Sequence, residues 1–137
     1  MLFVKRIAEN LPDTNVILRY LIKDNRELYN RADQFFSKIK VGEERAIILE
    51  SVIAECIYVL IKIYKVPRDE AANSLIAILN YRGIANHDRD DLISALYLFA
   101  REKIDIVECI LYVKANNSGS ILFSFDNDLN KMARLNK

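Results

Sequence analysis

Carboxylates stand where the predicted strands of this chain end. Asp13 directly follows a predicted strand over residues 6–11, and Asp126 and Asp128 directly follow another over residues 121–125. The carboxyl ends of parallel strands meet at one edge of a sheet, where α/β proteins bind their ligands. If these two strands are parallel, we expect the three carboxylates to lie close together at that edge.

Further acids lie at helix starts that reach the same edge. Glu55 is one turn into the helix after a second predicted strand, and Asp105 and Glu108 share a face at the start of the helix before the last strand. Carboxylates brought together repel one another unless cations neutralise them. Oxygen ligands without a His or Cys cluster favour Mg²⁺ or Mn²⁺. The pattern therefore predicts a metal site that activates water for attack on a phosphodiester bond.

The same acids also have a simpler interpretation as helix caps. Asp and Glu at helix starts accept bonds from free backbone N–H groups and complement the helix dipole. With 19 acids in 137 residues, some fall at such positions in any case. Their joint placement after several strands favours the metal site over capping alone.

The elements that must position these acids alternate between strands and helices. The alternation implies βαβ units and a mainly parallel sheet with helices on both faces. Ser51 can cap the helix that carries Glu55, and residues 121–125 form the strongest strand pattern. Apolar spacing and capping residues predict helices over about 16–21, 25–40, 52–63, 68–83, 92–99, 105–115 and 127–135, and strands over 6–11, 45–49, 84–87 and 121–125.

Composition restricts the class of protein. The 137 residues fit one domain over 1–137, and 52% apolar content with three Gly and two Pro favours helices around a sizeable core. A net charge of +1 gives no global basic field, so local charge and metal ions would have to hold a nucleic acid. Cys56 and Cys109 are too far apart for a metal pair and suit buried positions in a reducing cytosol. With no signal peptide or membrane span evident, we expect a cytoplasmic protein.

Four blocks of the sequence resemble PIN domains, and VapC-type toxin ribonucleases in particular. They cover residues 11–21, 51–60, 105–111 and 122–129, come in the family order, and place the resemblance over about residues 6–135. The resemblance implies a three-layer α/β/α sandwich with a central, mainly parallel sheet of about four to five strands. It also implies Mg²⁺- or Mn²⁺-dependent endonucleolytic cleavage of RNA, a cognate antitoxin protein and a homodimer.

The resemblance also assigns residues to the site. Asn15 would orient a ligand or water, Ser124 would supply a hydroxyl beside the last acid, and Asp128 and Asp105 would be auxiliary acids. The metal-binding and catalytic carboxylates that it implies are Asp13, Glu55, Glu108 and Asp126.

Two departures from the family pattern support an alternative function. Glu108 stands where the family has aspartate, and the first strand contains Glu9 and Asn10 and ends at Pro12. The alternative is a catalytically impaired PIN-like module that binds RNA or protein. A phosphatase would need a second Asp where the chain has Asn15, and a phosphoacceptor receiver domain would need an acidic pair and a Lys at the strand ends.

Basic pairs on two helices are candidate RNA contacts. Arg19 and Lys23 lie one turn apart on the first helix, and Lys131 and Arg134 do so on the last. Both pairs could flank the acids and bind phosphates, although charged outer faces are common. His87, the only histidine, lies among aspartates and is interpreted as a loop residue.

Overall fold

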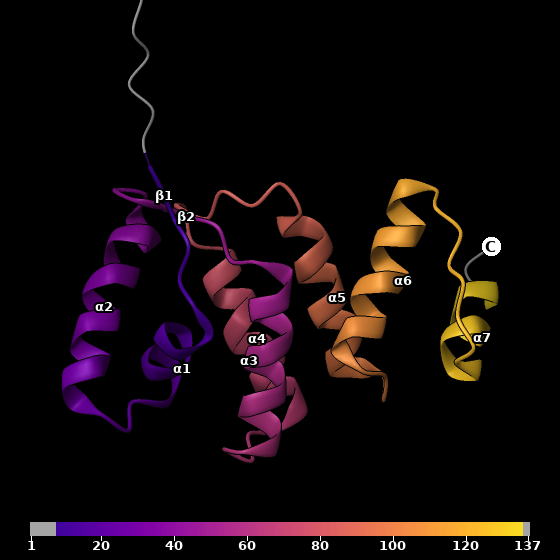
Figure 1. The fold of residues 1–137 in the computed structure, drawn as a ribbon, viewed down its shortest axis with the longest axis horizontal. Coiled ribbons are helices and arrows are strands. Elements are labelled where there is room, and N and C mark those ends of the chain that lie inside the picture. Colours follow the sequence, from indigo (N-terminus) through magenta and orange to yellow (C-terminus); the bar gives the residue numbers. More distant parts are fainter. Residues whose placement is uncertain (1–7, 136–137) are drawn as a thin grey trace, which may run out of the picture.

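The computed structural model describes residues 8–135 and consists mostly of helices packed on a small parallel sheet (Figure 1). The predicted α/β class is confirmed, and the helices lie close to their predicted positions. Their bounds are α1 Thr14–Ile22, α2 Arg26–Val41, α3 Glu50–Lys62, α4 Arg68–Leu79, α5 Arg89–Arg101, α6 Ile106–Ser118 and α7 Asn127–Leu135, and the strands are β1 Glu9–Asn10 and β2 Arg45–Ala46.

The sheet is parallel and smaller than predicted. In β1 and β2, Glu9 pairs with Arg45 and Asn10 with Ala46, and Ile84 forms a single parallel bridge to Ala46. The predicted first strand begins before residue 8, so part of it lies outside the described residues. Over residues 8–135 the sheet therefore has two strands and a bridge instead of the four to five strands expected.

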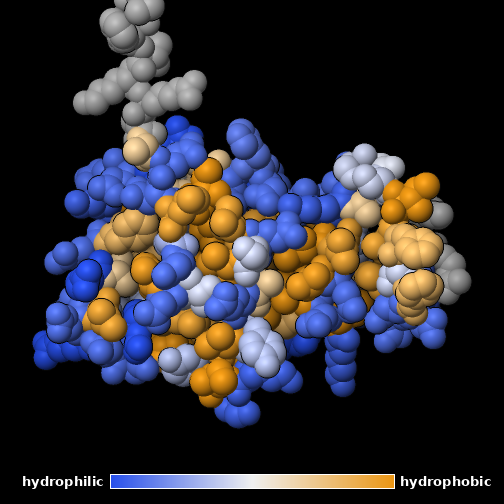
Figure 2. Space-filling view, in the orientation of Figure 1, coloured by the Kyte–Doolittle hydropathy of each residue, from blue (hydrophilic) through white to orange (hydrophobic). Residues whose placement is uncertain are grey.

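Residues 121–125, predicted to be a strand, pair with no strand in the described part of the chain. Three of the large apolar side chains face outward, with 94% of Ile121, 83% of Phe123 and 91% of Phe125 exposed, while Leu122 packs against the core. Gly119, at a φ of 73°, ends α6 and turns the chain toward α7. An alternating apolar segment becomes a strand only where a neighbouring edge supplies backbone partners, and here the segment runs between α6 and α7 (Figure 1). Figure 2 shows the resulting apolar surface at the α7 end of the molecule.

The hydrophobic core joins the sheet to α1–α6 and includes Leu129 of α7. Amphipathic spacing buries one face of each helix, and both cysteines are buried and free, as the sequence predicts. No helix among the described residues is long and apolar enough to cross a membrane. The largest fully buried side chains include Phe36, Ile48, Ile53, Leu60, Leu75 and Leu92.

Capping residues set where the first helices begin. Asp13 caps α1 and Asn25 caps α2, each accepting a hydrogen bond from a backbone N–H three residues ahead, as the sequence predicts for Asp13. The prediction that Ser51 caps α3 is wrong, because the helix already begins at Glu50 and the N-cap residue Leu49 offers no side-chain acceptor. The chain leaving β2 therefore enters α3 through an apolar residue.

Candidate functional site

Asp13 lies just after β1, where the chain turns into α1. Its Oδ1 accepts a hydrogen bond from the N–H of Val16 at 3.0 Å, which fixes the carboxylate at the helix N-terminus. The side chain is exposed, and Oδ2 makes no hydrogen bond within residues 8–135. The cap thus orients Asp13 and leaves one oxygen for a ligand.

Glu55 lies in α3 near Asp13. The pKa of the adjacent Cys56 thiol is raised to about 12, first by burial and then by the negative charge of Glu55, with a smaller contribution from Asp13. A hydrogen bond with Thr14 acts in the opposite direction. Both carboxylates are therefore close enough to this thiol to affect its ionisation. We call these two acids the N-terminal pair.

The acids of α6 are positioned by a partly buried arginine. Arg68, at the start of α4, donates from Nε to the carbonyl oxygen of Phe99 at 2.6 Å and also donates to the carbonyl oxygen of Ile104. Its guanidinium lies 3.5 Å from the centroid of the Phe99 ring. These contacts fix the connection from α5 to α6. They therefore set where Asp105, the N-cap residue, and Glu108, in the first turn, are placed.

Glu108 lies among other acids. Its pKa is raised, first by burial and then by the negative charges of Asp126, Asp105 and Asp128, while a backbone hydrogen bond at Asp105 lowers it. Glu108 therefore faces the first turn of α7 as well as its own helix start. We call Glu108 and Asp126, with Asp105 and Asp128 beside them, the C-terminal group.

Asp126 caps α7 as Asp13 caps α1. Its Oδ1 accepts from the N–H of Leu129 at 2.9 Å, and its own N–H donates to Ser124 Oγ at 2.9 Å. The Asn130 amide donates to the carbonyl oxygen of Ser124 at 2.6 Å, which closes the turn. The hydroxyl of Ser124 thus holds the backbone of Asp126, and one oxygen of Asp126 remains free to bind a ligand.

The N-terminal pair and the C-terminal group stay apart in this structure. Helices α1 and α7 lie toward opposite ends of the long axis, with α3 to α6 between them (Figure 1). Among the described residues, no three His, Cys, Asp or Glu side chains are close enough to hold a metal ion. The reason is the unpaired segment 121–125, which leads Asp126 to the outer side of α6 instead of to the edge of β1. The chemistry of the donors, all oxygens, still suits a hard divalent cation.

Lys114 neutralises acids that belong to neither group. Its Nζ lies 2.6 Å from Glu50 Oε2 and 3.0 Å from Asp88 Oδ2. Burial opposes ionisation of Asp88, but hydrogen bonds from Asn86 and Lys114 outweigh it and lower the pKa of Asp88. The Asn86 amide also bonds both backbone groups of Ile48, at 2.9 and 2.7 Å. This cluster ties α3, α5 and α6 together beside the sheet.

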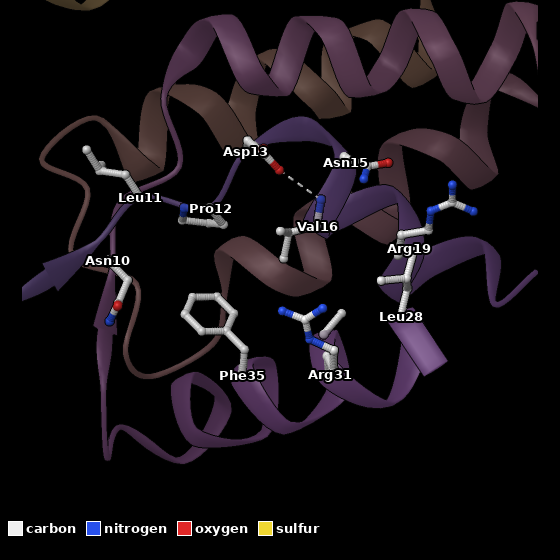
Figure 3. A pocket seen from close by; sticks show the side chains of 11 residues that line it. Asn10, Leu11, Pro12, Asp13, Asn15, Val16, Arg19, Leu28, Arg31 and Phe35 are labelled. Atoms are coloured by element: carbon white, nitrogen blue, oxygen red, sulfur yellow. Dashed lines mark hydrogen bonds between the residues drawn. The ribbon is translucent and has the colours of Figure 1, made fainter. Parts of the chain in front are cut away.

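A cavity of about 470 Å³ opens beside Asp13, between α1 and α2 (Figure 3). Asn15 and Arg19, two residues singled out from the sequence, line it. Arg31 and Phe35 also line it and were not predicted. Their spacing of four residues on α2 places them on one helix face, a signal that the sequence already contained.

The remaining predicted basic residues lie elsewhere. Lys23 ends α1 at a φ of 61° and sits 5.2 Å from the centroid of the Tyr29 ring. Lys131, together with Asp128, lines a second cavity of about 340 Å³ at α7. Arg134 belongs to α7, but its side chain lies outside the described part of the structure. His87 is exposed in the loop before α5, as expected.

Comparison with known proteins gave two matches. The family model described as PIN domain matches residues 11–135. A VapC ribonuclease of Aquifex aeolicus (strain VF5) is 28% identical over 109 residues, which is 80% of this chain and 80% of that protein. No solved structure matched the chain.

The cap at Asp13 leads to a stability prediction. Asp13→Asn keeps an oxygen that accepts from Val16 N–H, whereas Asp13→Ala leaves that donor without its partner. We expect Asp13→Ala to lower the free energy of unfolding by about 1 kcal/mol and Asp13→Asn to change it by much less. Urea denaturation in chelator measures both values. Equal losses in the two variants would contradict the capping role.

The raised pKa of Glu108 leads to a pH prediction. The pKa of Glu108 is higher in the folded protein than in the unfolded chain. Ionised Glu108 therefore lowers the free energy of unfolding at neutral pH. As pH falls, protonation of Glu108 removes this destabilisation. In chelator at pH 7, Glu108→Gln should therefore be more stable than the wild type by about 0.2–0.5 kcal/mol for each like-charge contact removed.

The pH profile provides the check on this second prediction. The stability difference between Glu108→Gln and the wild type should shrink as pH falls through the folded-state pKa of Glu108 and vanish below the unfolded value. Glu70→Gln, an exposed acid in α4, serves as the matched control. A Glu108→Gln variant less stable than the wild type at pH 7 would show that the neighbouring acids do not repel it.

Proposed function

The chain belongs to the PIN-domain family, and from that premise we propose that it is a Mg²⁺- or Mn²⁺-dependent endoribonuclease, the toxin of a toxin–antitoxin pair. The family fold is the three-layer α/β/α sandwich, and the match to a VapC ribonuclease supports a ribonuclease of this general kind. We further propose that residues 1–137 form one PIN domain.

The observation that carries the proposal is that the four candidate carboxylates have no basic partner. Asp13, Glu55, Glu108 and Asp126 take part in none of the ion pairs formed within residues 8–135. Other acids nearby, such as Glu50 and Asp88, are paired with Lys114. Carboxylates that repel one another and lack a protein cation are the ligands that a divalent ion stabilises.

Each side chain has a separate role in this proposal. Asp13, Glu55, Glu108 and Asp126 would hold the cation, which lowers the pKa of a water and offsets the charge of the phosphate under attack. Asn15, on the first turn of α1, would orient the RNA or a water. Ser124 positions Asp126 through its backbone bond. Asp105 and Asp128 add negative charge around Glu108.

Assembly of one site requires the two groups of acids to come together. Within the described residues, the segment over 121–125 pairs with no strand and exposes Ile121, Phe123 and Phe125. It is held in place by the packing of Leu122 on the core and by the hydrogen bonds of Ser124. Pairing of this segment with the β1 edge would follow the parallel order predicted from the sequence. Neutralisation of the repelling acids by a cation would favour that arrangement.

The proposed partners are RNA, a cognate antitoxin protein and a second copy of the chain. Large side chains such as Tyr58, Tyr97 and Leu111 are about half exposed or more, which supports protein contacts on these helices. The two free, buried cysteines are compatible with a reducing cytoplasm, where we propose that the protein acts.

The second candidate function is a binding module with little or no catalysis. The observation in its favour is the separation of Asp13 from Asp126, together with the longer side chain of Glu108. Such a module would bind RNA or a protein partner, and a divalent ion without turnover, or no ion at all.

Cleavage of a mixed single-stranded RNA pool tests the nuclease proposal. We expect cleavage in Mg²⁺ or Mn²⁺, none in chelator, and a loss of about a hundredfold or more in Asp13→Asn, which keeps the α1 cap but removes the charge. Asp69→Asn, an exposed first-turn acid of α4, is the matched control and should cleave like the wild type.

Two results would contradict the nuclease proposal. Cleavage that persists in chelator would exclude the metal mechanism. Metal binding by calorimetry, with RNA binding but no turnover in either ion, would favour the binding module instead.

A further inference from the structure

The cavity between α1 and α2 contains an arginine without an acidic partner. Arg31 makes no ion pair with any described acid, although Asp13 lines the same cavity. Arg19, on the opposite wall, is already paired through Nη1 with Asp24 Oδ1 at 2.9 Å. The uncompensated positive charge in this cavity is therefore that of Arg31.

The walls of the cavity combine this charge with apolar and amide groups. Figure 3 shows the Arg31 side chain rising from α2 toward α1, beside Phe35. Leu28 and Val16 add apolar surface, and Asn15 adds an amide close to Asp13. A cavity of about 470 Å³ falls within the range of about 300–1,000 Å³ typical of ligand sites.

We propose that this cavity is the subsite for an RNA nucleotide next to the scissile phosphate, with Arg31 binding its phosphate and Phe35 contacting its base. This inference rests on the proposed nuclease function, which places the scissile phosphate at Asp13. An arginine binds phosphate oxygens through two parallel hydrogen bonds. An aromatic ring in the same wall offers a face on which any base can stack.

The alternative ligand is a peptide with acidic residues. RNA is favoured because Asp13 itself lines the cavity, which places Arg31 and Phe35 next to a strand cleaved at Asp13. In addition, the positive charge of Arg31 lies beside the ring of Phe35. A nucleotide carries both an anionic phosphate and a flat base, so it can contact the two side chains together.

RNA binding measured in chelator reports on this subsite alone, because metal-dependent cleavage does not occur there. The probe is a fluorescein-labelled single-stranded RNA of mixed sequence, followed by anisotropy at several salt concentrations. We expect Arg31→Ala to raise Kd about tenfold and to reduce the slope of log Kd against log salt by about one. Arg31→Lys, which keeps the charge but loses the paired geometry, should recover part of the affinity and the full slope.

Two further variants complete the test. Phe35→Leu keeps apolar volume but removes the ring, so Kd should rise about fivefold with no change in the salt slope. Arg26→Ala removes an exposed arginine from the same helix, outside the cavity, and should bind like the wild type.

The outcomes distinguish failure of the subsite from failure of the nuclease. If the wild type cleaves RNA but Arg31→Ala keeps the wild-type Kd and the wild-type slope of log Kd against log salt, the subsite proposal is overturned. An acidic peptide is then the favoured ligand of the cavity. If Arg31→Ala weakens binding as expected while neither the wild type nor any variant cleaves RNA, the cavity stands as an RNA-binding site and the nuclease proposal fails. Absence of RNA binding by the wild type, or an equal loss in Arg26→Ala, overturns the subsite.

Discussion

Repulsion among carboxylates is the constraint on which the site of this protein depends. The pKa of the Glu108 carboxyl group is raised, first by burial and then by the negative charges of Asp126, Asp105 and Asp128. Lys114 neutralises Glu50 and Asp88, whereas the four candidate acids form no ion pair within residues 8–135. The fold thus accepts a local cost that a bound cation would remove. In the metal site that we propose, binding of the cation would stabilise the assembled arrangement of these acids.

Helix capping lets the chain fix two of these acids without basic partners. Asp13 and Asp126 each give one oxygen to a backbone N–H of the helix that follows. The bond sets the direction of the carboxylate and leaves the second oxygen available. The capping and metal-binding interpretations of the sequence are therefore compatible, since one side chain can do both.

Local signals in the sequence predicted most of the helices. Apolar spacing and the capping residue Asp13 depend on neighbours within one or two turns, and the structure places α1 and α2 where these signals put them. Sequence spacing also predicted that Asp105 and Glu108 share a helix face. The resemblance to PIN domains implied which four acids bind the metal. The acids remain a prediction, because the structure gathers them into two groups and does not join these into one site.

Strand pairing was the part that the sequence could not supply. The alternation of residues 121–125 shows that the segment could be a strand, but not which edge it pairs with, because pairing joins residues far apart in the chain. The same holds for the cavity at Arg31 and Phe35. Their shared face was readable from the spacing, whereas its position beside Asp13 required the packing of α2 on α1.

The most direct test of the account is whether one cation binds both groups of acids. Mn²⁺ added in substoichiometric amounts to the ¹⁵N-labelled protein broadens the amide signals of residues near the bound ion. If one cation binds all four acids, signals around Asp13 and Glu55 will broaden together with those around Glu108 and Asp126, over the same range of added Mn²⁺. Broadening confined to one of the two groups, or spread over unrelated surface acids such as Asp69, would contradict a single four-carboxylate site.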